Sequence, residues 1–417
     1  MKSHYDGVVS KPLPRLRMDL DFMPSPVEDR PGLLIRDPFH YSDVTLIVPP
    51  PLVPVLSMFD GEQTDDEMCR VLLDMTGDVR VGELQRHLLD SLDQAGFLEG
   101  DRFDEIRAAT EQAFAEAPVR EPAHANGGYP GDRDELAAWM SENMLGAAAS
   151  VAAHSNGLLG IAAPHVSPDG GWDSYRSAYK ALTPDLAEKT FVVLGTSHYG
   201  QPETFGLTRK QFVTPFGTAQ TQLDLVDRLA AKATLAVRME DYCHAIEHSI
   251  EFQIVFLQSI YGPDVKILPI LCGPFAHSLY LGGKPEDDDG VREFFDALGE
   301  MQSREGDRLR WVLGVDMAHI GRRYGDELSA EAHTGEMLAV AARDKERIEQ
   351  LTLGDARGFW DRVQPEHDDL KWCGSAPFYT FLNVVPQARG RLRHYEQWNI
   401  DQESVVSFGA IEFHAGT

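Results

Sequence analysis

The sequence predicts an α/β protein with a largely parallel sheet covered by helices, preceded by a small amino-terminal α+β module. Three observations lead to this prediction. The chain has 417 residues, of which 43% are apolar, enough to fill the cores of two domains. Apolar runs alternate with helical stretches in its later part, as in parallel sheets. A segment rich in Pro, Gly and Ala separates that part from the beginning.

The amino-terminal module is predicted to be mainly helical. A short β-like run in TLIVPP precedes a turn signal at Asp60-Gly61. Helical composition over residues 65–76 and regularly spaced leucines over 81–95 predict two helices. This strand, turn and helix pair resembles the PqqD-like, winged-helix-like modules that bind peptides in some biosynthetic systems. A helical cap on the large domain is the alternative interpretation.

Composition also predicts the domain boundaries. We expect the module to span residues 1–105, a helix and linker to span 106–127, and the large domain to span 128–417. The linker prediction depends on PVREPAHANGGYPGD, which has no hydrophobic periodicity.

Three of the predicted strands run directly into ionisable residues. The four strands are expected over residues 158–163, 191–194, 266–271 and 311–315. The first leads into His165, the second into His198, and the last into Asp316 and His319. A single histidine there would be interpreted as a hydrogen-bonded loop residue. Because ligands bind at the carboxyl ends of such strands, the repetition indicates one shared site.

The segment HAIEHSIEFQIVFLQSIYG is predicted to be one buried helix, because its apolar residues recur at helical spacing. Ionisable side chains rarely lie on such a helix without partners. The segment carries His244, Glu247, His248 and Glu251, and we therefore expect Glu247, His248 and Glu251 to face a site rather than solvent.

Cys373 lies in KWCGSAPFYTFLNVV, where Gly374 and Pro377 predict a turn into a helix. A thiol near a helix amino terminus is expected to have a lowered pKa, which makes it a better metal ligand or nucleophile. From its position alone, however, a buried and inert cysteine is the favoured interpretation.

Six motifs together resemble those of the Memo family, whose members are similar to protein B of AmmeMemoRadiSam systems. The resemblance extends from about Gly128 to the end of the chain. In order, the motifs are APH (163–165), GTSH (195–198), TPFG (214–217), EHSIE (247–251), DMAH (316–319) and CGSAP (373–377). The resemblance implies a fold related to class III extradiol dioxygenases, and a site in which two histidines and a cysteine hold iron or copper.

Carried onto the matching positions, the implied metal ligands are His165, His198 and Cys373, with Asp316 and His319 as further pocket residues. One difference limits the comparison. Many Memo proteins have an aromatic AGYxYSG-like segment after APH, whereas this chain has VSPDGGWDSYRSAYKAL. The substrate is therefore not carried over from the family.

Two imidazoles and one anionic ligand on one face of Fe(II) leave coordination positions open for substrate and dioxygen, as in the facial triad of non-haem iron enzymes. We expect Fe(II), with copper as the alternative because thiolate is a soft ligand. His319 is expected to act as general acid or base, oriented by Asp316 or His248. The remaining pocket predictions are Glu247, Glu251, Trp172 and Thr214.

Three function classes follow from these residues. The favoured one is a metal-dependent, dioxygenase-like oxidoreductase acting on a small molecule or peptide. The alternative is a non-catalytic peptide- or protein-binding module that uses the same pocket with a radical S-adenosylmethionine (SAM) partner, a partner class that the resemblance suggests. A hydrolase with Ser197 or Cys373 as nucleophile ranks last, because GTSHYG does not match G-x-S-x-G.

Charge and cysteine usage narrow the partners and the compartment. The net charge of −28 repels phosphate backbones and anionic lipids, so neither nucleic acid nor membrane is an expected partner. The start of the chain lacks the apolar core of a signal peptide, and no later run approaches a membrane span. Four cysteines without paired spacing predict reduced thiols. We expect a cytoplasmic protein.

Overall fold

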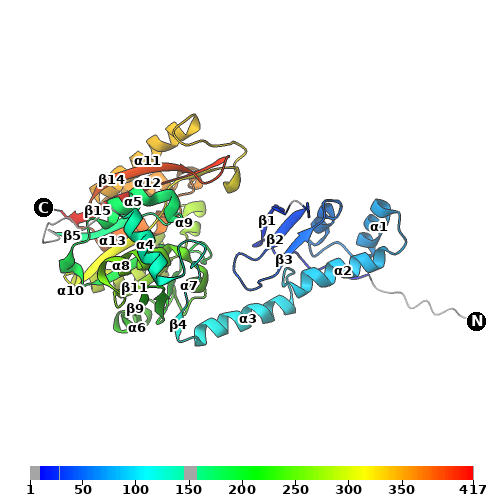
Figure 1. Cartoon of the computed structure of the whole chain (residues 1–417), viewed down its shortest axis with the longest axis horizontal. Coiled ribbons are helices and arrows are strands. Elements are labelled where there is room, and N and C mark those ends of the chain that lie inside the picture. The colour runs from blue at the N-terminus through cyan, green and yellow to red at the C-terminus, as the bar shows by residue number, and fades with distance from the viewer. Residues whose placement is uncertain (1–9, 28, 145–156, 417) are drawn as a thin grey trace, which may run out of the picture. The chain divides into compact units, whose positions relative to one another are not determined.

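The computed structural model describes residues 10–27, 29–144 and 157–416. The chain divides into two compact units, Met1–Glu116 and Ala117–Thr417 (Figure 1). The expectation about a signal peptide concerns in part residues 1–9, which lie outside the described ranges. Among the helices of those ranges, none combines the length and apolar character that a membrane crossing requires.

The small unit contains a three-stranded antiparallel sheet and helices. Its elements are β1 (Asp21–Pro24), β2 (Leu33–Arg36), β3 (Thr45–Val48), η1 (Pro50–Met58), α1 (Asp65–Thr76), α2 (Val81–Gln94) and α3 (Asp101–Glu116). Helices α1 and α2 confirm the two predicted helices. A capping box between Thr64 and Glu67 begins α1, and Gly77 ends it with a φ of 66°. Strands β1 and β2 were not predicted, because four residues are too few to show an alternating pattern.

The large unit is built on a 12-stranded sheet. Its strands are β4 (Val119–Arg120), β5 (Leu158–Ala163), β6 (Thr190–Thr196), β7 (Phe205–Leu207), β8 (Gln211–Thr214), β9 (Gly217–Thr221), β10 (Val237–Met239), β11 (Lys266–Cys272), β12 (Leu309–Gly314), β13 (His319–Gly321), β14 (Ala388–Asn399) and β15 (Ser404–Ala415). Its centre has the order β5-β12-β6-β11, and every pair in that series is parallel. The predicted α/β class and the four predicted strands are confirmed.

Helices cover both faces of this sheet. They are α4 (Arg133–Asn143), α5 (Pro168–Tyr179), α6 (Leu223–Lys232), α7 (Cys243–Ile246), α8 (His248–Tyr261), α9 (Ala276–Leu281), α10 (Asp289–Glu305), α11 (Glu336–Leu353), α12 (Ala356–Val363) and α13 (Ser375–Val384). Alternate strand residues enter two separate cores. Val192 and Leu194 pack in the core with α6, α10, α11, α12 and α13, whereas Phe191 and Val193 pack in the core with α4, α5 and α8. Burial on both faces explains why these strands are continuously apolar.

Strands β14 and β15 form a long antiparallel pair that extends the sheet beside β5. This pair was not predicted. Strand β14, with the sequence ARGRLRHYEQWN, is largely polar and partly exposed, and therefore has no apolar alternation to recognise. An antiparallel edge on a parallel sheet is common among large sheets.

Residues 117–127, where we expected a linker, pack within the large unit. Strand β4 pairs with β8, and the Arg120 side chain is buried against α8. Hydrogen bonds and the buried Arg120 guanidinium hold this segment in the large unit. The hydrophobic pattern of the sequence therefore gave no sign that the segment packs there.

Candidate metal centre

The carboxyl ends of three adjacent strands bring the predicted residues together. His165 follows β5, His198 follows β6 and Asp316 follows β12, and these strands are neighbours in the order β5-β12-β6. The expected convergence at one edge of the sheet is present. The imidazole ring centres of His165 and His198 are 5.0 Å apart.

The amino-terminal turn of α8 lies close against these strand ends because two strand residues are glycines. A Cβ atom on Gly314 of β12 would lie 2.1 Å from the backbone oxygen of Ser249, and one on Gly195 of β6 would lie 2.5 Å from Ser249 Oγ. Only residues without a side chain fit there. The glycines thereby allow His248, the first residue of α8, to reach the histidines of β5 and β6.

We predict that Gly314→Ala lowers the free energy of unfolding by about 1–3 kcal/mol, the usual cost of overpacking a core. Because the clash is with backbone, the first turn of α8 must move, so metal affinity should fall as well. Gly299→Ala in α10 is the matched control, since its Cβ would meet no atom within 4 Å. Urea unfolding of both variants measures the effect. Equal stability of the two variants would contradict this account.

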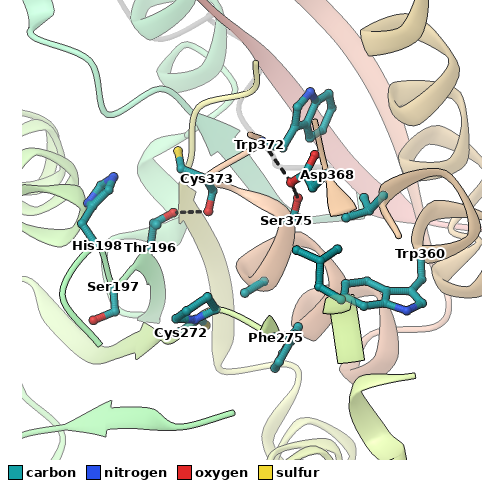
Figure 2. Close-up of a pocket in the computed structure, with 14 residues that line it drawn as sticks. Thr196, Ser197, His198, Cys272, Phe275, Trp360, Asp368, Trp372, Cys373 and Ser375 are labelled. Atoms are coloured by element: carbon teal, nitrogen blue, oxygen red, sulfur yellow. Dashed lines mark hydrogen bonds between the residues drawn. The ribbon is translucent and has the colours of Figure 1, made fainter. Parts of the chain in front are cut away.

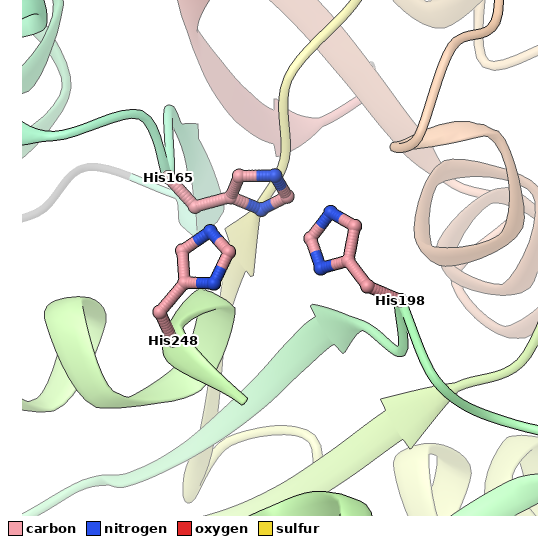
Figure 3. A group of neighbouring side chains, drawn as sticks. All are labelled: His165, His198 and His248. Carbon is pink, nitrogen blue, oxygen red and sulfur yellow. The ribbon is translucent and has the colours of Figure 1, made fainter. Parts of the chain in front are cut away.

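Three imidazoles face one another at this point (Figure 3). The ring centres of His165, His198 and His248 are separated by 5.0, 5.0 and 5.1 Å. One nitrogen from each ring lies within 4.8 Å of the other two. Small side-chain movements would suffice to place all three nitrogens around one ion.

A second group of candidate ligands shares His165. The Cys373 Sγ atom lies 3.3 Å from His165 Nε2, and an Asp316 carboxylate oxygen lies 3.4 Å from the same nitrogen. The three ligands implied by the family resemblance are thus divided between two groups that meet at His165.

Hydrogen bonds orient the imidazoles for metal binding. His165 Nδ1 is 2.9 Å from the Gly314 carbonyl oxygen, which can only accept, so Nδ1 donates and Nε2 keeps its lone pair. His319 Nδ1 likewise bonds the carbonyl oxygen of Met317 at 2.9 Å. The predicted orientation of His319 by Asp316 or His248 differs from this arrangement. Backbone carbonyls of Met317 and Lys371 orient the ring instead.

Glu247 has a position that the sequence did not reveal. The predicted continuous helix is interrupted at this residue, which caps α8 from an extended conformation (φ −80°, ψ 133°). Its buried carboxylate accepts hydrogen bonds from the backbone N–H groups of His198, His248 and Ser249. These donors stabilise the break and replace helical hydrogen bonds.

Burial controls the protonation of most ionisable groups in the site, but the pKa of His198 is raised well above its ordinary value by the Glu247 carboxylate and Cys373 despite burial. Burial lowers the pKa of His165 to about 3 and that of His319 to about 4, so both imidazoles are neutral near pH 7. It raises the pKa of Asp316 to about 6. Burial also raises the pKa of the Cys373 thiol, so the expected lowering by the helix amino terminus is wrong for the metal-free chain. Here desolvation outweighs the helix dipole.

An open cavity of about 740 Å³ leads to these side chains. His165, His198, His248, Asp316, His319 and Cys373 all line it. His124 lines it too and was missed, because it lies in the segment interpreted as linker. Val166, Val406 and Trp398 form an apolar wall.

Four predicted pocket residues lie outside the cavity lining. Trp172 packs against Trp139, with ring centres 4.5 Å apart, and Thr214 donates to Gln258. Glu247 and Glu251 lie behind the lining and support it through hydrogen bonds. None of the four is among the side chains that line the cavity in the described ranges.

A second, smaller cavity of about 240 Å³ is also lined by Cys373 and His198 and is mainly apolar (Figure 2). Thr196 Oγ1 donates to the Cys373 carbonyl oxygen at 2.9 Å, and Asp368 accepts from Trp372 N at 3.0 Å. These bonds fix the loop that carries the thiol. Ser197, the serine considered as a hydrolase nucleophile, has no hydrogen bond to a histidine in the described part of the chain.

Comparison with known proteins gives the family of this chain. A family model described as Memo-like protein matches residues 120–412. A MEMO1 family protein of Aquifex aeolicus is 24% identical over 385 residues, covering 91% of this chain and 96% of that protein. Because this match is longer than the large unit, it includes part of the small unit.

The MEMO1 family protein TK1477 of Thermococcus kodakarensis is 26% identical over 306 residues, covering 71% of this chain and 99% of that protein. A solved structure, described as uncharacterized protein JW3007 from Escherichia coli K12, covers 54% of this chain and 86% of its own, with 14% identity and a TM-score of 0.35. A likeness of that size supports no conclusion about this chain.

Proposed function

The chain belongs to the Memo-like family, and from this premise we propose that it is a metal-dependent oxidoreductase acting on a small molecule or peptide. The ion, Fe(II) or alternatively copper, is held by His165, His198 and Cys373. The observation that supports the proposal most strongly is the meeting of imidazoles and a thiol at the ends of adjacent parallel strands.

The donor atoms suit such an ion. Imidazole nitrogen and thiolate sulfur favour iron and copper over magnesium and calcium, which prefer oxygen ligands. His165 Nε2 is unprotonated, and Cys373 Sγ lies beside it at 3.3 Å. A bound ion would supply the one-electron chemistry that the side chains lack.

His319 is the proposed acid–base residue. It lines the open cavity, and its Nε2 is unprotonated near neutral pH because burial lowers its pKa to about 4. Such a nitrogen can accept a proton from bound substrate. The Tyr324 ring, edge-on at 4.9 Å between ring centres, restricts the imidazole.

We expect protein purified without oxygen to carry close to one equivalent of Fe or Cu, because the proposed ligands come from rigid strand ends. His319→Ala should keep that metal and lose oxidative turnover, which oxygen consumption with a candidate substrate measures. Elemental analysis showing no transition metal, even after anaerobic addition of Fe(II) or Cu(I), would contradict the proposal and favour a binding role.

The second candidate is a non-catalytic module that binds a peptide or protein and works with a radical SAM partner. One feature of the small unit favours it. A groove of about 610 Å³, lined in part by Leu16, Phe22 and Leu56, lies beside strand β1, which is at the edge of its sheet. An edge strand next to an apolar groove can accept an extended peptide. The PqqD-like resemblance of this unit agrees with that function.

A further inference from the structure

We propose that His248 is an additional ligand of the ion, and that Glu247 is the positioning residue that aims both His248 and His198 at it. This inference rests on the proposed metal site and goes beyond the ligand set of two histidines and a cysteine. His165, His198 and His248 are related by nearly equal ring separations of 5.0 to 5.1 Å.

The reach of His248 is sufficient. Imidazole nitrogens bind transition metals at about 2.0–2.1 Å, so three nitrogens on one ion are separated from one another by no more than about 3.6 Å. The relevant nitrogens of the three histidines already lie within 4.8 Å of one another. A movement of each nitrogen by less than about 1 Å closes the difference.

Glu247 gives His198 and His248 the same orientation. Its carboxylate oxygens lie 3.1 Å from His198 Nδ1, and one of them lies 3.2 Å from His248 Nδ1. Glu247 also accepts from three backbone N–H groups, a donor environment that holds it in the ionised form. A carboxylate can only accept, so His198 Nδ1 donates and His198 presents Nε2 to the ion, while His248 Nδ1 lies at ion-pair distance from the same carboxylate.

One carboxylate beside two ligand imidazoles, and hydrogen-bonded to His198, has a clear chemical effect. A carboxylate behind a histidine fixes its tautomer and increases its basicity toward a metal. Here the backbone of Glu247 is fixed as well, because the buried Arg120 side chain donates to its carbonyl oxygen at 3.0 Å. The position of Glu247 is therefore set independently of the imidazoles, which is what a positioning residue requires.

A purely structural role for His248 predicts a different arrangement. A ring that only packs on His198 needs no shared carboxylate and has no reason to present a lone pair to the open cavity, yet His248 lines that cavity. Among the rings next to His248 are His198, stacked at 9°, and His165, nearly perpendicular at 74°; His124 and Phe252 also lie beside it. This places one ring nitrogen from each of the three histidines around one volume.

The test uses ¹¹³Cd(II), a thiol-compatible and redox-silent ion, bound to the full chain labelled with ¹⁵N-histidine. Scalar coupling between the ion and each bound nitrogen counts the imidazoles directly. We expect couplings to three histidines in the wild type and to two in His248→Ala. Couplings to His165 and His198 alone in the wild type would overturn the assignment of His248.

Glu247→Gln tests the positioning role. The amide can still accept, but it also brings donors, so at least one imidazole should change tautomer, which ¹⁵N shifts of the metal-free protein report. Cadmium affinity, measured by chelator competition, should fall about 10- to 100-fold, as for other residues behind metal ligands. Glu203→Gln is the control, because that buried glutamate pairs with His277 away from the site.

An affinity of Glu247→Gln within about twofold of the wild type, with unchanged ¹⁵N shifts, would overturn the positioning role. Neither the cadmium coupling nor the cadmium affinity depends on oxidative turnover. The outcomes therefore distinguish a failure of this inference from a failure of the proposed function. Cadmium coupled to His165 and His198 but not to His248 removes only this inference. No cadmium coupling to any histidine removes the proposed metal site together with it.

Discussion

Replacing His165 by Ala is expected to abolish stoichiometric binding of Fe(II) or copper at micromolar supply. His165 is the one residue common to both groups of candidate ligands, and its Nε2 atom is within 3.4 Å of both Cys373 and Asp316. Losing a direct ligand costs more than losing a residue behind one, for which about 10- to 100-fold is typical. Affinity should therefore fall by more than about 100-fold.

Cys373→Ser should have a similar effect, because a hydroxyl is a far poorer ligand for a soft ion than a thiolate. Metal content after gel filtration and competition with a chelator measure both variants. His394→Ala is the matched control, since His394 pairs with Glu396 on β14 and is not among the residues that line the cavity. Full metal content in His165→Ala would refute the site assignment, because neither ligand group is complete without it.

The position of the centre could be predicted because a simple pattern encodes it. Continuously apolar strands such as FVVLGT have few alternatives once both faces of a sheet are covered, and a polar residue directly after such a strand must lie at the sheet edge. The same rule led to His165, His198 and Asp316. It needed no information about tertiary contacts.

Other parts of the site depend on contacts that no local pattern records. Glu247 lies in a sequence with helical periodicity, yet three backbone N–H groups and the His198 imidazole hold it outside the helix. The pKa of the Cys373 thiol is raised by the burial of its loop and is not lowered by the nearby helix terminus. Composition alone assigns segment 117–127 to a linker, but its polar side chains hold it in the large unit. In each case tertiary hydrogen bonding or desolvation overrides the local signal.

Glu251→Ala is expected to destabilise the large unit by about 3–5 kcal/mol, the usual cost of leaving a buried charge without its partner. Glu251 is fully buried on α8 and forms an ion pair with Arg120. It also accepts from the Tyr129 hydroxyl and from the backbone N–H groups of Ala123 and His124. Removing the carboxylate leaves the buried guanidinium uncompensated and frees the segment that carries His124.

The double variant Arg120→Met with Glu251→Met separates charge from packing. Apolar residues of similar volume often replace a buried ion pair at little cost, so the double variant should be more stable than Glu251→Ala. Urea unfolding monitored by circular dichroism gives both values. If the double variant loses as much as the sum of the single substitutions, the ion pair is not the source of the effect.

The pH dependence provides an independent check on Glu251. Burial alone would raise its pKa, but Arg120, His124 and Tyr129 together hold it below its ordinary value of 4.5. A carboxyl with a lowered pKa in the folded state contributes stability above its unfolded pKa and loses it as pH falls through the folded pKa. The stability difference between wild type and Glu251→Ala should therefore be constant above about pH 5 and shrink below about pH 4.5. A difference that grows in acid would mean that Glu251 is protonated in the fold, and that Arg120 is compensated by another group.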